Sequence, residues 1–196
     1  PAPNPLLPSG FGEALALSAD GQVLAVGSPY DSSAATGVDG DPGNTGATFS
    51  GAAYVFARDN AGWNQRAYIK ASNIGANDRF GSTLALSSDG QALAVGAIGE
   101  SSDARGINGD QGNDNAPDTG AAYLFTHSAT GWRQQAYLKP SNTAEYSVYQ
   151  FGAALALSGD GLALAVSCPY ASNATAGVGG DQADASGVNV GAVYLY

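Results

Sequence analysis

Apolar and polar positions alternate with a period of two in the most regular part of the chain. In residues 15–18 the leucines fall on one face of an extended segment and Ala16 falls on the other, so both faces are apolar. Asp20 and Gly21 follow, and these residue types favour a tight hairpin turn because they tolerate positive φ. A second apolar segment comes next, at residues 23–26. The pattern therefore predicts two antiparallel strands joined by a short turn.

The same pattern returns twice further along the chain. Each copy opens with Phe-Gly, at Phe11, Phe80 and Phe151, so the copies begin 69 and 71 residues apart. Repetition at a fixed period indicates structural units that bury their faces against one another. The expected first strands are 15–18, 84–86 and 155–157, the second 23–26, 93–95 and 164–166, and the third 52–56, 121–125 and 192–196.

A fourth strand is expected in the first two copies only. A Gly-Trp turn, at residues 62–63 and 131–132, is predicted to lead into strands at 65–70 and 134–139. Short antiparallel strands with two apolar faces are typical of a sheet packed between two similar sheets, which is the blade of a β-propeller. The sequence therefore predicts an all-β fold of β-propeller blades, with three four-stranded antiparallel repeats in an incomplete propeller. The predicted boundaries are 1–10 for a strand-like segment that completes a blade, then 11–79, 80–150 and 151–196 for the blades, the last without a fourth strand.

Charge and composition narrow the functional classes. The 196 residues contain 17 acidic and 7 basic side chains, a formal net charge of −10. Nucleic acid is therefore not an expected partner, because phosphate binding needs clustered Lys and Arg. No apolar run approaches the roughly 20 residues of a membrane-spanning helix, so no membrane insertion is expected. An acidic, Gly-rich chain with one cysteine and no methionine suits a secreted or surface protein of bacteria, and the absence of an initial Met is compatible with a removed leader.

Several motifs resemble a known family. The Phe-Gly openings, the Leu-Ala-Val-Gly strand at residues 24–27 and the Gly-Ala-x-Tyr strands are similar to FG-GAP repeats, the blades of the integrin α-subunit propeller, in their bacterial form. The resemblance extends from Phe11 to Tyr196 and implies a propeller fold with adhesive, carbohydrate-contacting or scaffolding roles. The third copy departs from it, with Ser-Cys-Pro at 167–169. The family's calcium loop between the first two strands is also missing, since those turns carry single acids, at Asp20, Asp89 and Asp160.

Three blades are fewer than a closed propeller needs, which is four or more. The expected third strand at the C-terminus is an unpaired edge, and such edges recruit partners. We expect a homo-oligomer or filament in which chains exchange strands, with residues 4–10 as the donated strand. The alternative is that the sequence is a fragment of a longer integrin-like propeller.

Three loops of 21 residues each, at 30–50, 99–119 and 170–190, contain ten of the acidic side chains. Loops of this length are usually functional or disordered, and their equal length argues against disorder. Oxygen-bearing side chains between glycines are the ligands that Ca²⁺ prefers, but Asp and Asn also cap turns through hydrogen bonds to the backbone. The sequence leaves calcium and turn formation open. The candidate ligands are Asp39, Asp41 and Asn44 in the first loop, Asn108, Asp110 and Asn113 in the second, and Asp181 and Asp184 in the third.

The remaining candidates favour structural roles. His127 has Arg58 at its position in the first copy, and Cys168 aligns with Ser28 and Ala97, which indicates a small buried residue. Trp63 and Trp132 could stack on sugar rings, but packing of the outer strand explains their recurrence better. No enzyme is expected. The predicted function is an extracellular structural or adhesive protein that self-assembles, and the alternative is a propeller module that binds a glycan or a protein.

Overall fold

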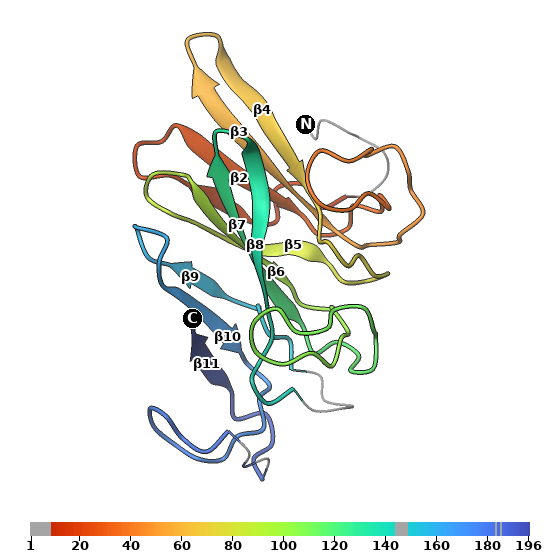
Figure 1. The fold of residues 1–196 in the computed structure, drawn as a ribbon, viewed down its shortest axis with the longest axis vertical. Coiled ribbons are helices and arrows are strands. Elements are labelled where there is room, and N and C mark those ends of the chain that lie inside the picture. The colour runs from red at the N-terminus through yellow and green to blue at the C-terminus, as the bar shows by residue number, and fades with distance from the viewer. Residues whose placement is uncertain (1–8, 144–148, 183, 185) are drawn as a thin grey trace.

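The structure is a computed structural model that describes residues 9–143, 149–182, 184 and 186–196. It is all-β, as predicted, and its strands form three antiparallel sheets that lie one above the other in Figure 1. We call these sheets blades 1, 2 and 3. Blade 1 contains β1 (Leu15–Leu17), β2 (Val23–Ser28), β3 (Ala52–Asp59) and β4 (Gly62–Ile69). Blade 2 contains β5 (Phe80–Leu86), β6 (Ala92–Ala97), β7 (Ala121–Ser128) and β8 (Gly131–Leu138), and blade 3 contains β9 (Leu155–Leu157), β10 (Leu164–Cys168) and β11 (Ala192–Leu195).

The order of strands follows the chain in every sheet. Blades 1 and 2 have four strands each, and blade 3 has three, with β11 at its edge. The blades stack without closing into a ring (Figure 1). Of the N-terminal segment predicted to donate a strand, residues 1–8 lie outside the described part of the chain, and Ser9 and Gly10 belong to no strand. Among the described residues, no helix has the length and apolar character needed to cross a membrane.

The turn between the first two strands forms as the sequence predicts. Ser18 N donates to Val23 O at 2.9 Å, and Gly21 N donates to Ser18 O at 2.9 Å. The Asp20 carboxylate accepts from Ser18 Oγ at 2.6 Å and from Gln22 N at 3.0 Å. The same serine and aspartate contacts recur in the corresponding turns of blades 2 and 3. An Asx turn thus fixes each hairpin.

The predicted Gly-Trp turn is wrong. Gly62 and Trp63 are the first residues of β4, and Asp59 pairs with Gly62 across a turn made by residues 60–61. The turn forms there because Asp59 Oδ1 accepts a hydrogen bond from Ala61 N at 2.8 Å. Gly62, with a φ of 115°, supplies the left-handed conformation that starts the returning strand.

Blades pack with large side chains on small ones. On the blade 1 side of the first junction the buried residues are mostly small, including Ala25, Ala53 and Val55. They face Leu93 and other large side chains of blade 2. The second junction repeats this arrangement, with Ala94 and Ala122 of blade 2 in one cluster with Leu164, Val166 and Phe151 of blade 3. Alternation of large and small residues along each strand therefore gives every blade one large and one small face.

A close backbone approach explains the glycines of the Phe-Gly and Leu-Ala-Val-Gly motifs. A Cβ on Gly27 of blade 1 would lie 2.0 Å from the carbonyl oxygen of Gly81 in blade 2. Gly81 has a φ of 88°, and a Cβ on it would lie 2.1 Å from Ala52 O. Both positions therefore require glycine, because any side chain would separate the two blades.

The phenylalanine of each Phe-Gly pair packs inside its own blade. Phe80 makes edge-to-face contacts with Tyr123 at 5.2 Å and with Phe125 at 6.0 Å between ring centroids. Phe11 and Phe151 make the same contacts with the aromatic residues of β3 and of the C-terminal strand. Such pairs stabilise the large face of each sheet beyond the area they bury.

Candidate functional site in the long loops

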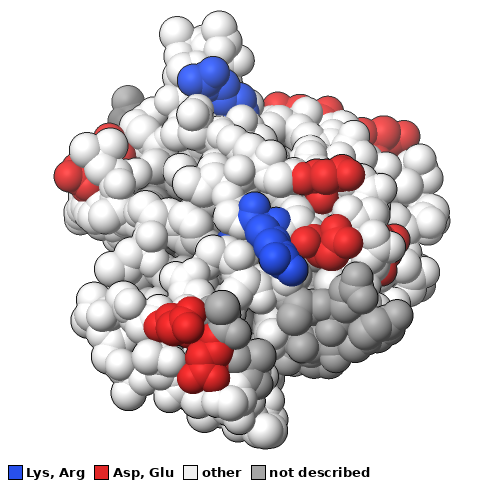
Figure 2. Space-filling view, turned by 60° about the horizontal axis from the view of Figure 1, so that its bottom comes forward, with Lys and Arg blue, Asp and Glu red and all other residues white. Residues whose placement is uncertain are grey.

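The three long loops connect the second and third strands of the blades. They lie on the side of the stack opposite the β3–β4 and β5–β6 turns (Figure 1). Acidic side chains outnumber basic ones on the face shown in Figure 2, which agrees with the net charge of −10. Ten of the 17 acidic side chains belong to the three loops.

Two of the predicted calcium ligands hold the loop to the fourth strand. Asp39 Oδ1 accepts a hydrogen bond from Tyr68 N at 2.9 Å, and Asp39 N donates to Tyr68 O at 2.7 Å. Asn108 makes the same pair of bonds with Tyr137, at 2.9 and 2.8 Å. Each residue has a φ of 55°. Each side chain thus holds its loop against the fourth strand, next to an isolated β-bridge between the loop and that strand.

Other candidate ligands close local turns. Asp41 Oδ1 accepts from Gly43 N at 2.8 Å, and Asp110 Oδ1 accepts from Gly112 N at 2.9 Å. Asn113 Oδ1 accepts from Asp103 N and from Asn115 N, both at 3.2 Å. The backbone carbonyl of Asn44 accepts from Ala34 N at 2.6 Å. The bonds to Gly43, Gly112 and Asn115 are those of Asx turns, whereas the bonds to Ala34 and Asp103 connect the two sides of a loop.

The third loop is built with different partners. Asp184 accepts hydrogen bonds from Thr175 Oγ1 at 2.9 Å and from Ser186 N at 3.0 Å. The Ser186 hydroxyl is the main cause that lowers the pKa of the Asp184 carboxyl. The carbonyl oxygen of Asp181 accepts from Asp184 N at 3.3 Å.

Four of the eight candidate ligands thus close Asx turns with their side chains, namely Asp41, Asp110, Asn113 and Asp184, and two others, Asp39 and Asn108, bind the fourth strand. In the described part of the chain, no three carboxylate, thiol or imidazole groups lie together in a way that could hold a metal ion. Calcium binding by the long loops stays a prediction.

The first loop contains a buried ion pair that the sequence analysis did not identify. Lys70, which follows β4, is fully buried, and its Nζ lies 3.4 Å from Asp31 Oδ1 and 2.7 Å from Ser50 Oγ. Tyr68 donates its hydroxyl to Asp31 Oδ1 at 2.9 Å, and Tyr54 donates to Oδ2 at 3.3 Å. Asp31 and Ser50 are close to the two ends of the loop, so one lysine ties both ends to the outer strand.

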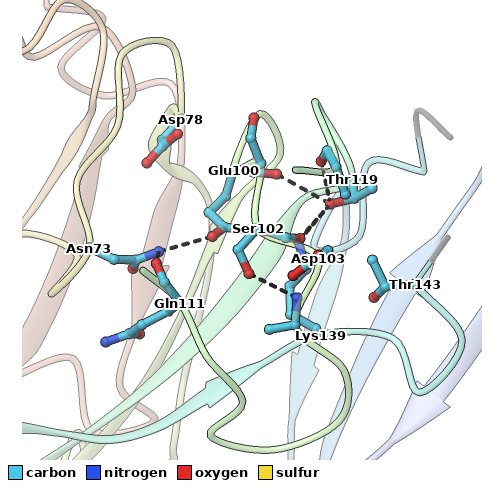
Figure 3. Close-up of polar contacts among 12 residues, drawn as sticks. Asn73, Asp78, Glu100, Ser102, Asp103, Gln111, Thr119, Lys139 and Thr143 are labelled. Atoms are coloured by element: carbon cyan, nitrogen blue, oxygen red, sulfur yellow. Dashed lines mark hydrogen bonds and ion pairs between the residues drawn. The ribbon is translucent and has the colours of Figure 1, made fainter. Parts of the chain in front are cut away.

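Blade 2 repeats this arrangement with conservative replacements (Figure 3). Lys139 Nζ donates to Glu100 Oε2 at 2.7 Å and to Thr119 Oγ1 at 2.6 Å. Tyr137 donates to Glu100 Oε1 at 2.7 Å. Asn73, from the connection between blades 1 and 2, donates to the same Oε1 at 2.9 Å. We call each set of acid, lysine, hydroxyl and tyrosine a lysine clamp.

Blade 3 has no equivalent charges at the corresponding positions. Ala171 stands where blades 1 and 2 have Asp31 and Glu100, and Val190 stands where they have Ser50 and Thr119. Ala171 is buried, and its N–H donates to Cys168 O at 3.2 Å. The fourth strand that would supply the lysine is also absent from the described residues. Apolar side chains therefore replace the carboxylate and the hydroxyl of the clamp in blade 3, while Tyr194 keeps the position of Tyr54 and Tyr123.

Burial disfavours the protonated form of the clamp lysines. Desolvation lowers the pKa of Lys70 to about 8, although Asp31 acts in the opposite direction. Desolvation also lowers the pKa of Lys139, and the ion pair with Glu100 again opposes the shift. Buried pairs of this kind depend on their partners, because a charge left alone in the interior is very unfavourable.

The sequence carried a signal for the clamps. Lys70 and Lys139 recur at the same spacing as Asp31 and Glu100, and both lysines follow a Tyr-x-Lys pattern in an apolar strand. A lysine at the end of an otherwise apolar strand indicates a buried partner. In the sequence analysis, Asp31 and Glu100 count among the acids of the long loops and have no assigned partner.

Other candidates are placed as follows. Cys168 is fully buried, as expected for a small packing residue, and burial raises the pKa of its thiol to about 12. His127 lies at an exposed position and contacts Gln91 and the ring of Trp132. Trp63 is 44% exposed.

The comparison with known families agrees with this architecture. A family model described as FG-GAP repeat matches residues 63–125, which span β4, the connection to blade 2 and β5 to β7. A search among curated proteins found no match.

Removing the lysine from a clamp is expected to lower the stability of the fold strongly. Lys139→Met leaves Glu100 buried without its charged partner and is expected to lower the free energy of unfolding by about 3–5 kcal/mol. Arg66→Met breaks the exposed pair with Asp59 and is expected to cost under about 1 kcal/mol. Urea unfolding followed by tryptophan fluorescence measures both. A Lys139→Met protein as stable as Arg66→Met would contradict the clamp.

The raised pKa of Asp78 is expected to make the stability of the fold depend on pH. Burial raises the pKa of this carboxyl from 3.8 to about 7; the hydrogen bond from Gly75 N at 2.6 Å opposes the shift and Glu100 adds to it. Because the folded-state pKa is the higher one, the protonated group favours folding at low pH, and this contribution is lost as the pH rises toward 7.

The substitution Asp78→Asn removes this titration but keeps an oxygen that can accept from Gly75 N. Between pH 5 and 7.5 the wild-type Tm is expected to fall by about 3 °C more than that of the variant, which corresponds to about 1 kcal/mol. Thermal melts followed by circular dichroism measure the difference. Parallel curves for the two proteins would show that Asp78 does not titrate in this range.

Proposed function

We propose that this protein is an extracellular structural or adhesive module that self-assembles, because residues 63–125 match the FG-GAP repeat model and such repeats are typical of extracellular and surface proteins. Chains associate end to end, blade 1 of one copy on blade 3 of the next. The acidic long loops remain on the outside of the assembly.

The uncovered faces at the two ends carry this proposal. On blade 1, Leu15 is 64% exposed and Leu17 is 58% exposed. Their counterparts in blade 2, Leu84 and Leu86, are partly buried against the cluster that joins blades 1 and 2. Blade 1 therefore presents the large face of a junction with nothing of the described chain upon it.

Blade 3 presents the opposite face. Val193 is 67% exposed and Leu195 is 79% exposed. Their counterparts in blade 1, Ala53 and Val55, are fully buried beneath blade 2. Exposed apolar surface of this kind marks a contact site in a soluble protein.

The two ends are thus the two halves of the junction that the chain already makes twice. An interface between two different surfaces joins subunits head to tail, and it gives a ring if the rotation closes and a filament if it does not. The edge of β11 adds a second reason for association, because an unpaired strand edge pairs readily with another chain.

The surroundings of Cys168 and His127, the side chains best suited to nucleophilic or acid–base catalysis, also favour a structural role. Catalysis by Cys168 would need an accessible thiolate, and its thiol is buried with a raised pKa. The imidazole of His127 contacts Gln91 and Trp132 at the margin of blade 2. We therefore propose a function without catalysis.

Light scattering coupled to size-exclusion chromatography tests the self-assembly. The wild-type protein is expected to exceed the monomer mass of 19.5 kDa increasingly as its concentration rises. Leu17→Glu and Leu195→Glu are each expected to remain monomeric, because a charge on either face opposes its burial. Leu162→Glu is the control, since Leu162 is 83% exposed in a turn, where the other copies have Gln22 and Gln91.

A mixture of the two monomeric variants separates this arrangement from others. Leu17→Glu keeps an intact blade 3 face and Leu195→Glu keeps an intact blade 1 face, so the mixture is expected to form dimers that cannot grow. A wild-type protein that stays at 19.5 kDa throughout, or a mixture that stays monomeric, would overturn the proposal.

A further inference from the structure

The lysine clamp of blade 2 brings an amine and a carboxyl group into contact in the interior of the protein (Figure 3). Lys139 Nζ lies 2.7 Å from Glu100 Oε2, and neither side chain is more than 2% exposed. The other carboxyl oxygen, Oε1, accepts from the Tyr137 hydroxyl at 2.7 Å and from Asn73 Nδ2 at 2.9 Å. The carboxyl group is therefore held at both oxygens, with the amine beside one of them.

The two groups of this pair can exchange a proton. Transfer of one proton from the ammonium to the carboxylate gives a neutral amine and a neutral carboxyl group. Burial favours the neutral amine, because desolvation lowers the pKa of Lys139. A neutral lysine is a nucleophile, and a site that holds it against the group it attacks removes the entropic cost of bringing the two together.

A second buried carboxyl group interacts with the pair. Asp78 is 3% exposed, and burial is the main cause that raises its pKa to about 7. The charge of Glu100 adds to this shift, and the charge of Lys139 opposes it. Asp78 therefore gains and loses its proton near neutral pH, in a place where the clamp senses its charge.

We infer that the clamp of blade 2 closes into an amide bond between Lys139 Nζ and Glu100 Cδ. The amine attacks Cδ, the bond from Cδ to Oε2 breaks, and Oε2 leaves as water with two protons from the nitrogen. Negative charge develops on Oε1 in the intermediate, where the hydrogen bonds from Tyr137 and Asn73 stabilise it. The step needs no oxidant or reductant.

The surroundings of the clamp fit the amide better than the ion pair. As an ammonium, Lys139 Nζ has three protons, and in the described part of the chain it has two acceptors, Glu100 Oε2 and Thr119 Oγ1. The amide keeps one N–H, directed at Thr119, and one carbonyl oxygen with its two donors. Every polar atom of the amide thus has a partner, and two charges leave the interior.

Burial also protects the product. Lys139 and Thr119 are both 0% exposed, so water has little access to hydrolyse the amide. Glu100 and Lys139 are 39 residues apart in the sequence, so the bond closes a covalent ring between the long loop and the residue after β8. Such a ring restricts the unfolded chain as a disulfide does, and a chain with one cysteine has no internal disulfide. The inference does not depend on self-assembly.

The clamp of blade 1 is less well arranged for this reaction. Lys70 Nζ lies 3.4 Å from Asp31 Oδ1, and the Tyr68 hydroxyl donates to the same oxygen at 2.9 Å. The other oxygen accepts from Tyr54 at 3.3 Å, a weaker bond for stabilising an intermediate. We expect Lys70 to remain an amine, which makes blade 1 an internal control.

The intact mass of the purified, denatured full chain tests the bond. One amide lowers the mass by about 18 Da, the mass of the water that leaves, relative to the mass given by the sequence. Lys139→Met is expected to have the full mass of its own sequence, whereas Arg66→Met is expected to keep the deficit. A wild-type chain with its full mass would overturn the inference, and this result requires no variant to fold.

Digestion with trypsin after denaturation locates the bond. Trypsin cuts after Arg and Lys but not before Pro140, so it leaves Glu100 in peptide 80–105 and Lys139 in peptide 134–196. The two peptides are expected in one species, lighter than their sum by about 18 Da. Recovery of the two as separate peptides would overturn the inference.

The same digest separates this bond from other losses of water. Cleavage after Lys70 is expected, because an amine in blade 1 remains a trypsin site. A deficit located at a cyclised Asp-Gly sequence, such as Asp39-Gly40, or at Lys70 in place of Lys139 would overturn the assignment to blade 2.

Discussion

Each sheet of this protein is apolar on both faces, so each needs a neighbour on both sides. Only blade 2 has both neighbours within the described chain. Its large face covers the small face of blade 1, and its own small face lies beneath blade 3. The contact of Gly27 with Gly81 sets how closely two blades approach, and the alternation of large and small residues decides which faces match. The same rule leaves one large and one small face uncovered at the ends of the stack.

The lysine clamps connect the long loops to this framework. A loop of 21 residues would be costly to order by itself, but Lys70 binds Asp31 near its beginning and Ser50 at its end, and Asp39 pairs with the fourth strand. The fourth strand thus orders the loop as well as completing the sheet. In blade 3 the positions of the acid and of the hydroxyl residue hold Ala171 and Val190, so the described residues form no clamp there.

Much of the fold could be predicted from the sequence, because the alternation of apolar residues at a fixed repeat fixes both the strands and their two buried faces. The position of the outer hairpin could not, since Asp59 makes the turn and the more conspicuous Gly62-Trp63 pair opens the next strand. The clamps were also missed, because Asp31 and Lys70 are 39 residues apart and meet only when the loop folds back. The predicted calcium ligands share a composition with turns, and only the partners of residues such as Asp39 and Asp110 distinguish the two roles.

The central claim is that the two ends of the stack complement each other as the internal junctions do. Electron microscopy of the wild-type protein at high concentration tests it most directly, because rings, filaments and single chains differ in outline. The account predicts particles in which blades continue at regular spacing across chain boundaries, as a ring or a filament. A field of separate three-blade particles at every concentration would contradict it.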